Sequence, residues 1–162
     1  FYPLDGLNHW NRMYGSQGFI QYQAWFPETT SRQGLAKLLE KIVASGRGSF
    51  LAVLKSCGVA SPGLLSFLDR GHTLALDFKN TGPHLLTLTQ ELNRIVLQHG
   101  GRLYLAKDAT MSAETFAAMY PRLSEFRAIQ SATDPDNKFI SSQARRLQII
   151  SRPKPKTATR ST

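Results

Sequence analysis

The stretch HTLALDFKNTGPHLLTLTQELNRIVLQHGGRLYLAK, residues 72–107, predicts a strand, a helix and a second strand in that order. Residues 72–78 alternate between two kinds of side chain, which is the pattern of a half-buried strand. The helix follows with one apolar face at helical spacing, formed by Leu85, Leu88, Leu92, Ile95 and Val96. Gly100 and Gly101 end this helix, and residues 102–107 form the second predicted strand.

The same order of elements occurs earlier in the chain. Residues 18–27 alternate like a strand, and residues 49–55 predict another. Between them lies a helical stripe formed by Leu35, Leu38, Leu39, Ile42 and Val43. Two strand–helix–strand (βαβ) units predict an α+β fold of the ferredoxin-like type, an antiparallel sheet with both helices on one face. Residues 113–130 predict two more helices separated at Pro121, and residues 141–150 a last short element.

Length and charge set the domain boundaries that we expect. The chain has 162 residues with a net charge of +9, and residues 151–162 contain four basic and no acidic side chains. We expect residues 18–150 to form the α+β domain, preceded by a lead-in at residues 1–17 and followed at residues 151–162 by a disordered basic tail. No stretch has the pattern of a signal peptide or a membrane span. The chain opens with FYPLDGLNHWN and without an initiator Met, so we expect a fragment. We expect the whole protein to be cytoplasmic or membrane-associated.

The composition limits the chemistry of the chain. Cys57 is the single cysteine, so an internal disulfide is excluded, and we expect an idle or buried thiol. The four histidines are scattered without the spacing of metal ligands, so no metal site is predicted.

Alternation also predicts a polar face on the sheet. If the apolar side chains of the two long strands face the helices, Gln21, Gln23, Thr73 and Asp77 lie on the other face. Lys55 and Lys107 then lie at strand ends. Such a face is either simply solvated or is the roof of a ligand site built with another domain.

Seven stretches occur in an order that is typical of one family. They are FYPLDGLNHWNRMYG (1–15), GFIQYQ (18–23), SFLAVLK (49–55), TLALDF (73–78), GGRLYLAKD (100–108), AMYPRLSEF (118–126) and ARRL (144–147). The chain resembles the C-terminal, substrate-capping part of FAD-dependent oxidases of the vanillyl-alcohol-oxidase superfamily. It is most similar to the decaprenylphosphoryl-β-D-ribose oxidase group, and the resemblance extends to about Leu147.

This resemblance implies a reaction and its partners. FAD is bound mainly by an N-terminal FAD-binding domain of the same protein, which is missing here and from which residues 1–17 are expected to lead in. The fragment alone is therefore expected to be inactive. The implied reaction oxidises the 2′-hydroxyl of a polyprenylphosphoryl ribose to a ketone, with hydride transfer to the flavin. An NAD(P)H-dependent short-chain reductase is the implied epimerase partner, the substrate is a lipid-linked sugar, and no nucleic acid is expected.

The resemblance also implies roles for individual residues. Lys107 matches the family lysine at the flavin and substrate, where an ammonium stabilises the negative charge of a reduced ring, so it is the predicted catalytic and cofactor-binding residue. Tyr104 matches a tyrosine near the ring. Gln21 and Gln23 match a strand that lines the pocket, and Lys55 matches a basic pocket residue that can meet a phosphate.

Thr73 and Asp77 complete the predicted substrate wall because they share its polar face. Two positions depart from the family pattern: Thr73 stands where an asparagine is usual, and Ala75 where mycobacterial members have a cysteine. The segment before Arg145 and Arg146 also lacks the usual acidic residue. These departures leave the exact substrate open between a polyprenylphosphoryl sugar and a simple polyol.

Two other functions are compatible with the fold. A basic ferredoxin-like domain can bind RNA through its open sheet face, although the aromatic string of RNA-recognition motifs does not occur here. A catalytically silent cap that serves only in assembly is the third interpretation.

Overall fold

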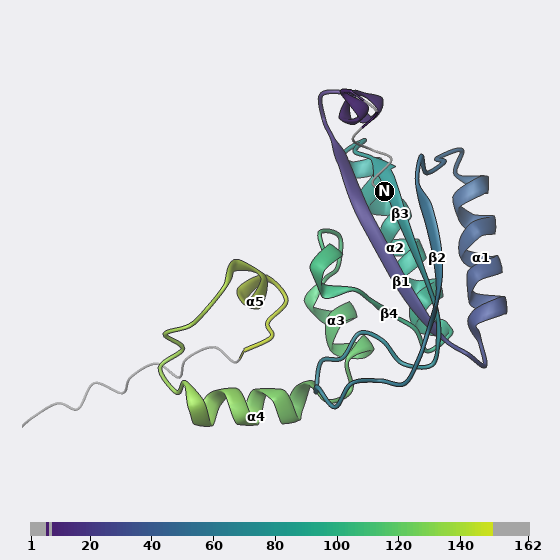
Figure 1. The fold of residues 1–162 in the computed structure, drawn as a ribbon. Helices are drawn as coiled ribbons and strands as arrows, with labels where there is room; N and C mark the ends of the chain where they lie inside the picture. The colour runs from purple at the N-terminus through teal and green to yellow at the C-terminus, as the bar shows by residue number, and fades with distance from the viewer. Residues whose placement is uncertain (1–5, 7, 151–162) are drawn as a thin grey trace, which may run out of the picture.

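The structure is a computed structural model that describes residues 6 and 8–150, so the predicted tail at 151–162 lies outside the described residues. Within that range the sheet is antiparallel with the strand order β2–β3–β1–β4 (Figure 1). The strands are β1 (Phe19–Pro27), β2 (Ala52–Cys57), β3 (Gly71–Lys79) and β4 (Arg102–Leu103). Helix α1 (Ser31–Ala44) connects β1 to β2, and α2 (Pro83–Gln98) connects β3 to β4. This arrangement confirms the predicted ferredoxin-like α+β fold.

The core lies between one face of the sheet and the two long helices. Strand alternation directs apolar side chains of both central strands toward the helices, namely Tyr22, Ala24, Phe26, Leu74, Leu76 and Phe78. They pack against Leu38 and Ile42 of α1 and against Leu85, Leu88, Leu92 and Val96 of α2. The predicted inward face of both strands and the apolar face of α2 are therefore confirmed.

Helix α1 buries a narrower stripe than the sequence predicts. Leu39 and Val43 are 45% and 78% exposed, whereas Leu38 is fully buried. The reason is a close approach of the helix at Gly34, where an added Cβ would lie 2.5 Å from the Phe26 ring. A helix this close to the sheet contacts it along one i, i+4 row, so the neighbouring apolar positions face outward.

Strand β2 begins later than predicted and also ends later, at Cys57, so Lys55 lies inside the strand and not at its end. Ser49 accounts for this shift, because its hydroxyl accepts a hydrogen bond from the Asp77 N–H at 2.9 Å and donates one to the Asp77 carbonyl at 3.1 Å. These side-chain bonds occupy the edge of β3 that a longer β2 would use. Regular pairing begins only at Ala52, opposite Leu76.

Strand β4 is shorter than predicted, and Lys107 does not lie on a strand. The Tyr104 N–H still bonds to the Gln23 carbonyl at 2.9 Å, but the chain then enters the 3₁₀ turn η3 (Leu105–Lys107). The Lys107 N–H closes this turn on the Tyr104 carbonyl at 2.9 Å. The strand thus ends where local turn bonds replace pairing with β1.

The C-terminal helices extend from the β4 edge. Helix α3 (Ala113–Met119) and helix α4 (Leu123–Thr133) are separated at Pro121, as predicted, and α5 (Ser142–Arg146) follows. Figure 1 shows α4 and α5 lying away from the sheet on the side of α3. Near the N-terminus, the 3₁₀ helix η2 (Trp10–Tyr14) precedes β1. No helix among the described residues is both long enough and apolar enough to cross a membrane.

Candidate functional site

A groove of about 720 Å³ lies on the sheet face opposite α1 and α2. Four of the seven predicted site residues line it: Gln23, Lys55, Thr73 and Tyr104. The rest of its wall comes from the end of β2 and the loop that follows, through Ser56, Cys57, Gly58, Val59, Ser61, Ser66, Phe67 and Leu68. The groove therefore combines strand side chains that alternation predicts with loop side chains that it does not.

Strand register explains why these polar residues meet. Lys55 of β2 lies directly opposite Thr73 of β3, so both side chains project from the same face. Gln23 of β1 lies opposite Ala75, the neighbour of Thr73 on that face. The Gln23 amide donates a hydrogen bond of 3.4 Å to the hydroxyl of Thr73, a residue that is 1% exposed. The polar floor of the groove is thus set by pairing across three strands.

The Lys55 ammonium is available to a ligand. The side chain is exposed, and it makes no hydrogen bond or ion pair with any residue that the structure describes. A free ammonium in a groove can meet a phosphate or another anion as a point charge.

Two aromatic rings form the other side of the groove. Phe67 stacks on Tyr104 with 4.7 Å between ring centroids, and Tyr104 remains 37% exposed. The loop that carries Phe67, residues 58–70, is fixed to the sheet, because the Trp25 indole donates to the Asp69 carbonyl at 2.8 Å. Arg102 donates to the Ser66 carbonyl at 2.9 Å. An aromatic wall beside amide, hydroxyl and ammonium groups suits a ligand with both apolar and polar parts.

Gln21 and Asp77 do not line this groove, although they lie on the same face as predicted. The Asp77 carboxylate is 5% exposed and accepts hydrogen bonds from the Gln21 amide at 3.0 Å and the Tyr14 hydroxyl at 3.2 Å. Burial and the nearby carboxylate raise the pKa of Tyr14. Asp77 is therefore satisfied inside the protein, and the polar face is covered here instead of solvated.

Lys107 lies at the end of η3, beside the groove residue Tyr104 but outside the groove wall. Its turn packs against β1. The ammonium of Lys107 forms no hydrogen bond or salt bridge with the described part of the chain. Two lysines without a partner among the described residues thus lie near Tyr104: Lys55 lines the same groove, and Lys107 ends the turn that Tyr104 begins.

Sequence reasoning missed the loop part of the site. Phe67, Ser66 and Leu68 have no periodic pattern, and only the SPG sequence at residues 61–63 marks a loop there. Cys57 is half-exposed in the groove wall, where extending the alternation of β2 by two residues beyond Lys55 would have placed it. Among the described residues, no group of three or more histidine, cysteine or acidic side chains could hold a metal ion.

Fold and groove together define a class: an α+β domain whose polar sheet face forms one wall of a binding site. Residues 76–147 match the family model described as D-arabinono-1,4-lactone oxidase. Over 151 residues, 93% of its length, the chain is 44% identical to decaprenylphosphoryl-beta-D-ribose oxidase of Mycolicibacterium smegmatis, of which it covers 32%. It is also 40% identical over 115 residues, 71% of its length, to a protein of Streptomyces coelicolor described as an uncharacterized protein in the mprA 5′ region, of which it covers 31%.

These matches confirm the resemblance that the motifs indicate. The chain is related to the C-terminal part of FAD-linked oxidases and is similar in particular to decaprenylphosphoryl-beta-D-ribose oxidase. It spans about a third of the length of the curated relatives that it matches.

Proposed function

We propose that this chain is the substrate-capping part of an FAD-dependent oxidoreductase that oxidises a sugar or polyol hydroxyl to a ketone. The observation that carries this proposal is the groove, which assembles Gln23, Lys55, Thr73 and Tyr104 in a chain related to FAD-linked oxidases. The substrate that we favour is a polyprenylphosphoryl ribose oxidised at its 2′-hydroxyl. The similarity to a decaprenylphosphoryl-ribose oxidase supports this choice over a simple polyol.

The groove residues suit the three parts of such a substrate. Lys55 offers a free ammonium for the phosphate. Gln23 offers an amide for sugar hydroxyls, and its bond to Thr73 orients that amide. The stacked rings of Phe67 and Tyr104 provide an apolar surface for the sugar face or the start of the lipid chain. Gln21 and Asp77 take the role of supporting the strand face instead of touching the substrate.

FAD, when bound, supplies the acceptor for the hydride that leaves the substrate. Tyr104 and Lys107 fit the ring end of this cofactor, because an aromatic side chain can pack against a planar ring and a cation can stabilise negative charge on its oxygen atoms. Tyr104 provides the ring and Lys107 provides an ammonium without a partner among the described residues. Lys107 would place its positive charge beside the flavin ring, which gains negative charge when it is reduced.

Three partners follow from this proposal. They are an N-terminal FAD-binding domain of the same protein, a lipid-linked sugar, and an NAD(P)H-dependent short-chain reductase that completes the epimerisation. RNA binding is the weaker alternative, because Trp25 of the central strand β1 is 3% exposed and lies under Arg102 and the 58–70 loop. A ring covered in this way does not stack on a base.

The test uses the full-length protein that contains this chain, kept without oxygen and mixed with a polyprenylphosphoryl ribose. Loss of the visible flavin absorbance within one turnover would establish the oxidase and its substrate class. A bound flavin that stays oxidised would reject this substrate, and a protein without flavin would reject the proposal. The matched control is the same lipid phosphate without the sugar, which must not reduce the flavin.

A further inference from the structure

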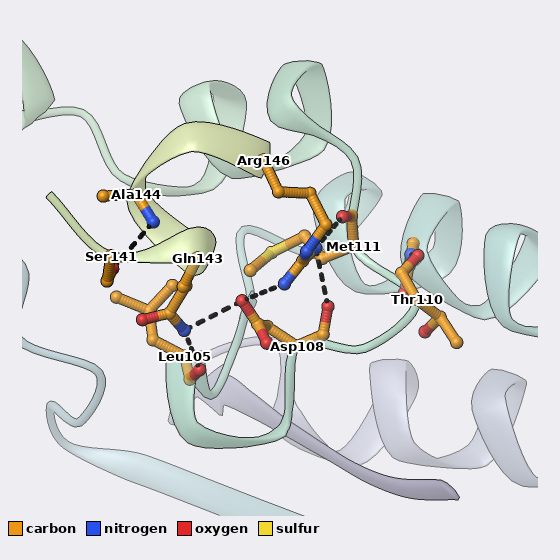
Figure 2. A network of polar contacts seen from close by, with 9 residues as sticks. Leu105, Asp108, Thr110, Met111, Ser141, Gln143, Ala144 and Arg146 are labelled. Atoms are coloured by element: carbon orange, nitrogen blue, oxygen red, sulfur yellow. Dashed lines mark hydrogen bonds and ion pairs between the residues drawn. The ribbon is translucent and has the colours of Figure 1, made fainter. Parts of the chain in front are cut away.

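Helix α5 is fastened to the turn that carries Lys107 (Figure 2). The Gln143 amide donates to the Leu105 carbonyl at 2.5 Å and to the Asp108 carboxylate at 2.9 Å. The Arg146 guanidinium forms a salt bridge of 2.7 Å with the same Asp108 oxygen. It also donates to the Met111 carbonyl at 2.9 Å and to the Asp108 carbonyl at 3.2 Å. We call this set of contacts the α5 clasp.

Two of the residues that the α5 clasp contacts flank Lys107 in the sequence: Leu105 precedes it by two positions and Asp108 follows it directly. Asp108 is therefore the acidic residue nearest to Lys107 in the sequence. Its carboxylate, however, is paired with Arg146, and the Asp108 side chain is only 13% exposed. The guanidinium and the amide both bind the same oxygen, Oδ2, and the positive charge of Arg146 offsets the negative charge that would otherwise attract a second cation.

We propose that Arg146 is a positioning residue that keeps Asp108 from neutralising Lys107. This inference rests on the proposed role of Lys107 at the cofactor. The physical reason is the cost of an unpaired carboxylate that is mostly buried: without Arg146, Asp108 takes the nearest cation. The ammonium of Lys107 then turns toward Asp108, and its positive charge is lost to the site.

Arg145 offers a matched control for this idea. It lies next to Arg146 on α5 and bears the same charge, but its exposed guanidinium makes no hydrogen bond or ion pair with any described residue. An effect of Arg146 that Arg145 does not share is therefore due to the contact with Asp108 and not to net charge.

The test compares four variants of the full-length flavoprotein: Arg146→Met, Asp108→Asn, their double variant, and Arg145→Met. Two quantities are measured, the rate of flavin reduction by substrate and the midpoint potential of the bound flavin, which a nearby positive charge raises. We expect Arg146→Met to slow reduction about tenfold and to lower the potential, whereas Arg145→Met changes neither. The double variant should recover most of both losses, because the competing carboxylate is gone.

Asp108→Asn alone keeps the inference testable if Arg146→Met does not fold. The asparagine oxygen still accepts a bond from Arg146, so we expect a rate and a potential near those of the wild type. If the clasp is merely structural, loss of the salt bridge in Asp108→Asn should itself slow reduction, and the double variant should be at least as impaired as Arg146→Met. Such a result would overturn the inference.

Lys107→Met separates this inference from the proposed function. If Lys107→Met slows reduction and lowers the potential, and Arg146→Met then adds no further loss, the inference is supported. If Lys107→Met has these effects but Arg146→Met behaves like the wild type, only the inference fails. If Lys107→Met leaves both quantities unchanged, the proposed role of Lys107 fails, and the inference fails with it.

Discussion

Arg102 lies over the indole ring of Trp25, with its guanidinium carbon 4.5 Å from the ring centroid. The two residues are register partners across β4 and β1, and each also holds the 58–70 loop: Arg102 through the Ser66 carbonyl and Trp25 through the Asp69 carbonyl. This pair connects the edge strand of the sheet to the loop wall of the groove. The position of the 58–70 loop in the groove wall therefore depends on side chains of β1 and β4 as well as on the loop sequence.

Arg102→Met should release the loop and destabilise the protein. It removes a stacked cation and the donor to Ser66, and charged hydrogen bonds of this kind contribute about 1.5–3 kcal/mol each. We expect the free energy of unfolding, measured by denaturant titration, to decrease by an amount within that range. Arg94→Met, on the exposed side of α2, is the control and should change it by less than about 0.5 kcal/mol. Equal losses in both variants would show that Arg102 does not anchor the loop.

Buried tyrosines should make the fold sensitive to alkali. Burial raises the pKa of Tyr22 and of Tyr120 above the ordinary value of 10.0. The folded protein therefore holds these protons more tightly than the unfolded chain. Their contribution to stability is complete below about pH 10 and is lost as the pH rises through the folded-state pKa.

Denaturant titrations between about pH 8 and pH 11.5 measure this loss. Tyr22→Phe should flatten the decline above pH 10, because one of the raised groups is gone. At pH 7 the same variant should be less stable by about 1–3 kcal/mol, since Asn93 loses the hydrogen bond of 3.0 Å that it accepts from Tyr22. An unchanged alkaline slope would contradict the assignment of Tyr22 as a buried acid.

Gly101→Ala should disturb the start of β4. A Cβ at this position would lie 2.4 Å from the Trp25 carbonyl oxygen and 2.9 Å from a Val96 methyl group. Backbone cannot yield as a flexible side chain does, so we expect a loss of about 1–3 kcal/mol or more in the free energy of unfolding. Gly48→Ala is the matched control, because nothing lies within 4 Å of its added Cβ. A stable Gly101→Ala protein would mean that β4 can move away from β1 at little cost.

Lys55→Ala should weaken binding of a phosphorylated substrate without affecting its unphosphorylated analogue. The exposed Lys55 ammonium has no partner among the described residues, so its removal costs a ligand contact but little folding energy. We expect KM for the phosphorylated substrate to rise about tenfold, equivalent to about 1.4 kcal/mol. Lys37→Ala on α1, where the lysine pairs with Glu40, should leave KM unchanged. A similar rise for both substrates would place the phosphate elsewhere.

Most of the fold was predictable because its elements have strong local periods. The alternation in β1 and β3 and the apolar face of α2 each follow from spacing within one segment. The same alternation predicts that Gln23 and Thr73 share one face, which the strand register confirms. The errors lie where a residue bonds to a different segment, as Ser49 does with Asp77 of β3 just before β2 begins.

The amino-acid sequence was sufficient to specify the strands, the helices and the polar face, since periods of 2 and 3.6 residues depend only on near neighbours. Only the tertiary structure divided that face, joining Gln21 to the buried Asp77 and leaving Gln23 in the groove. It also brought Arg146 to Asp108, and the 58–70 loop over Trp25. These contacts join residues far apart in the chain, and their geometry depends on strand register and loop paths, which no local pattern encodes.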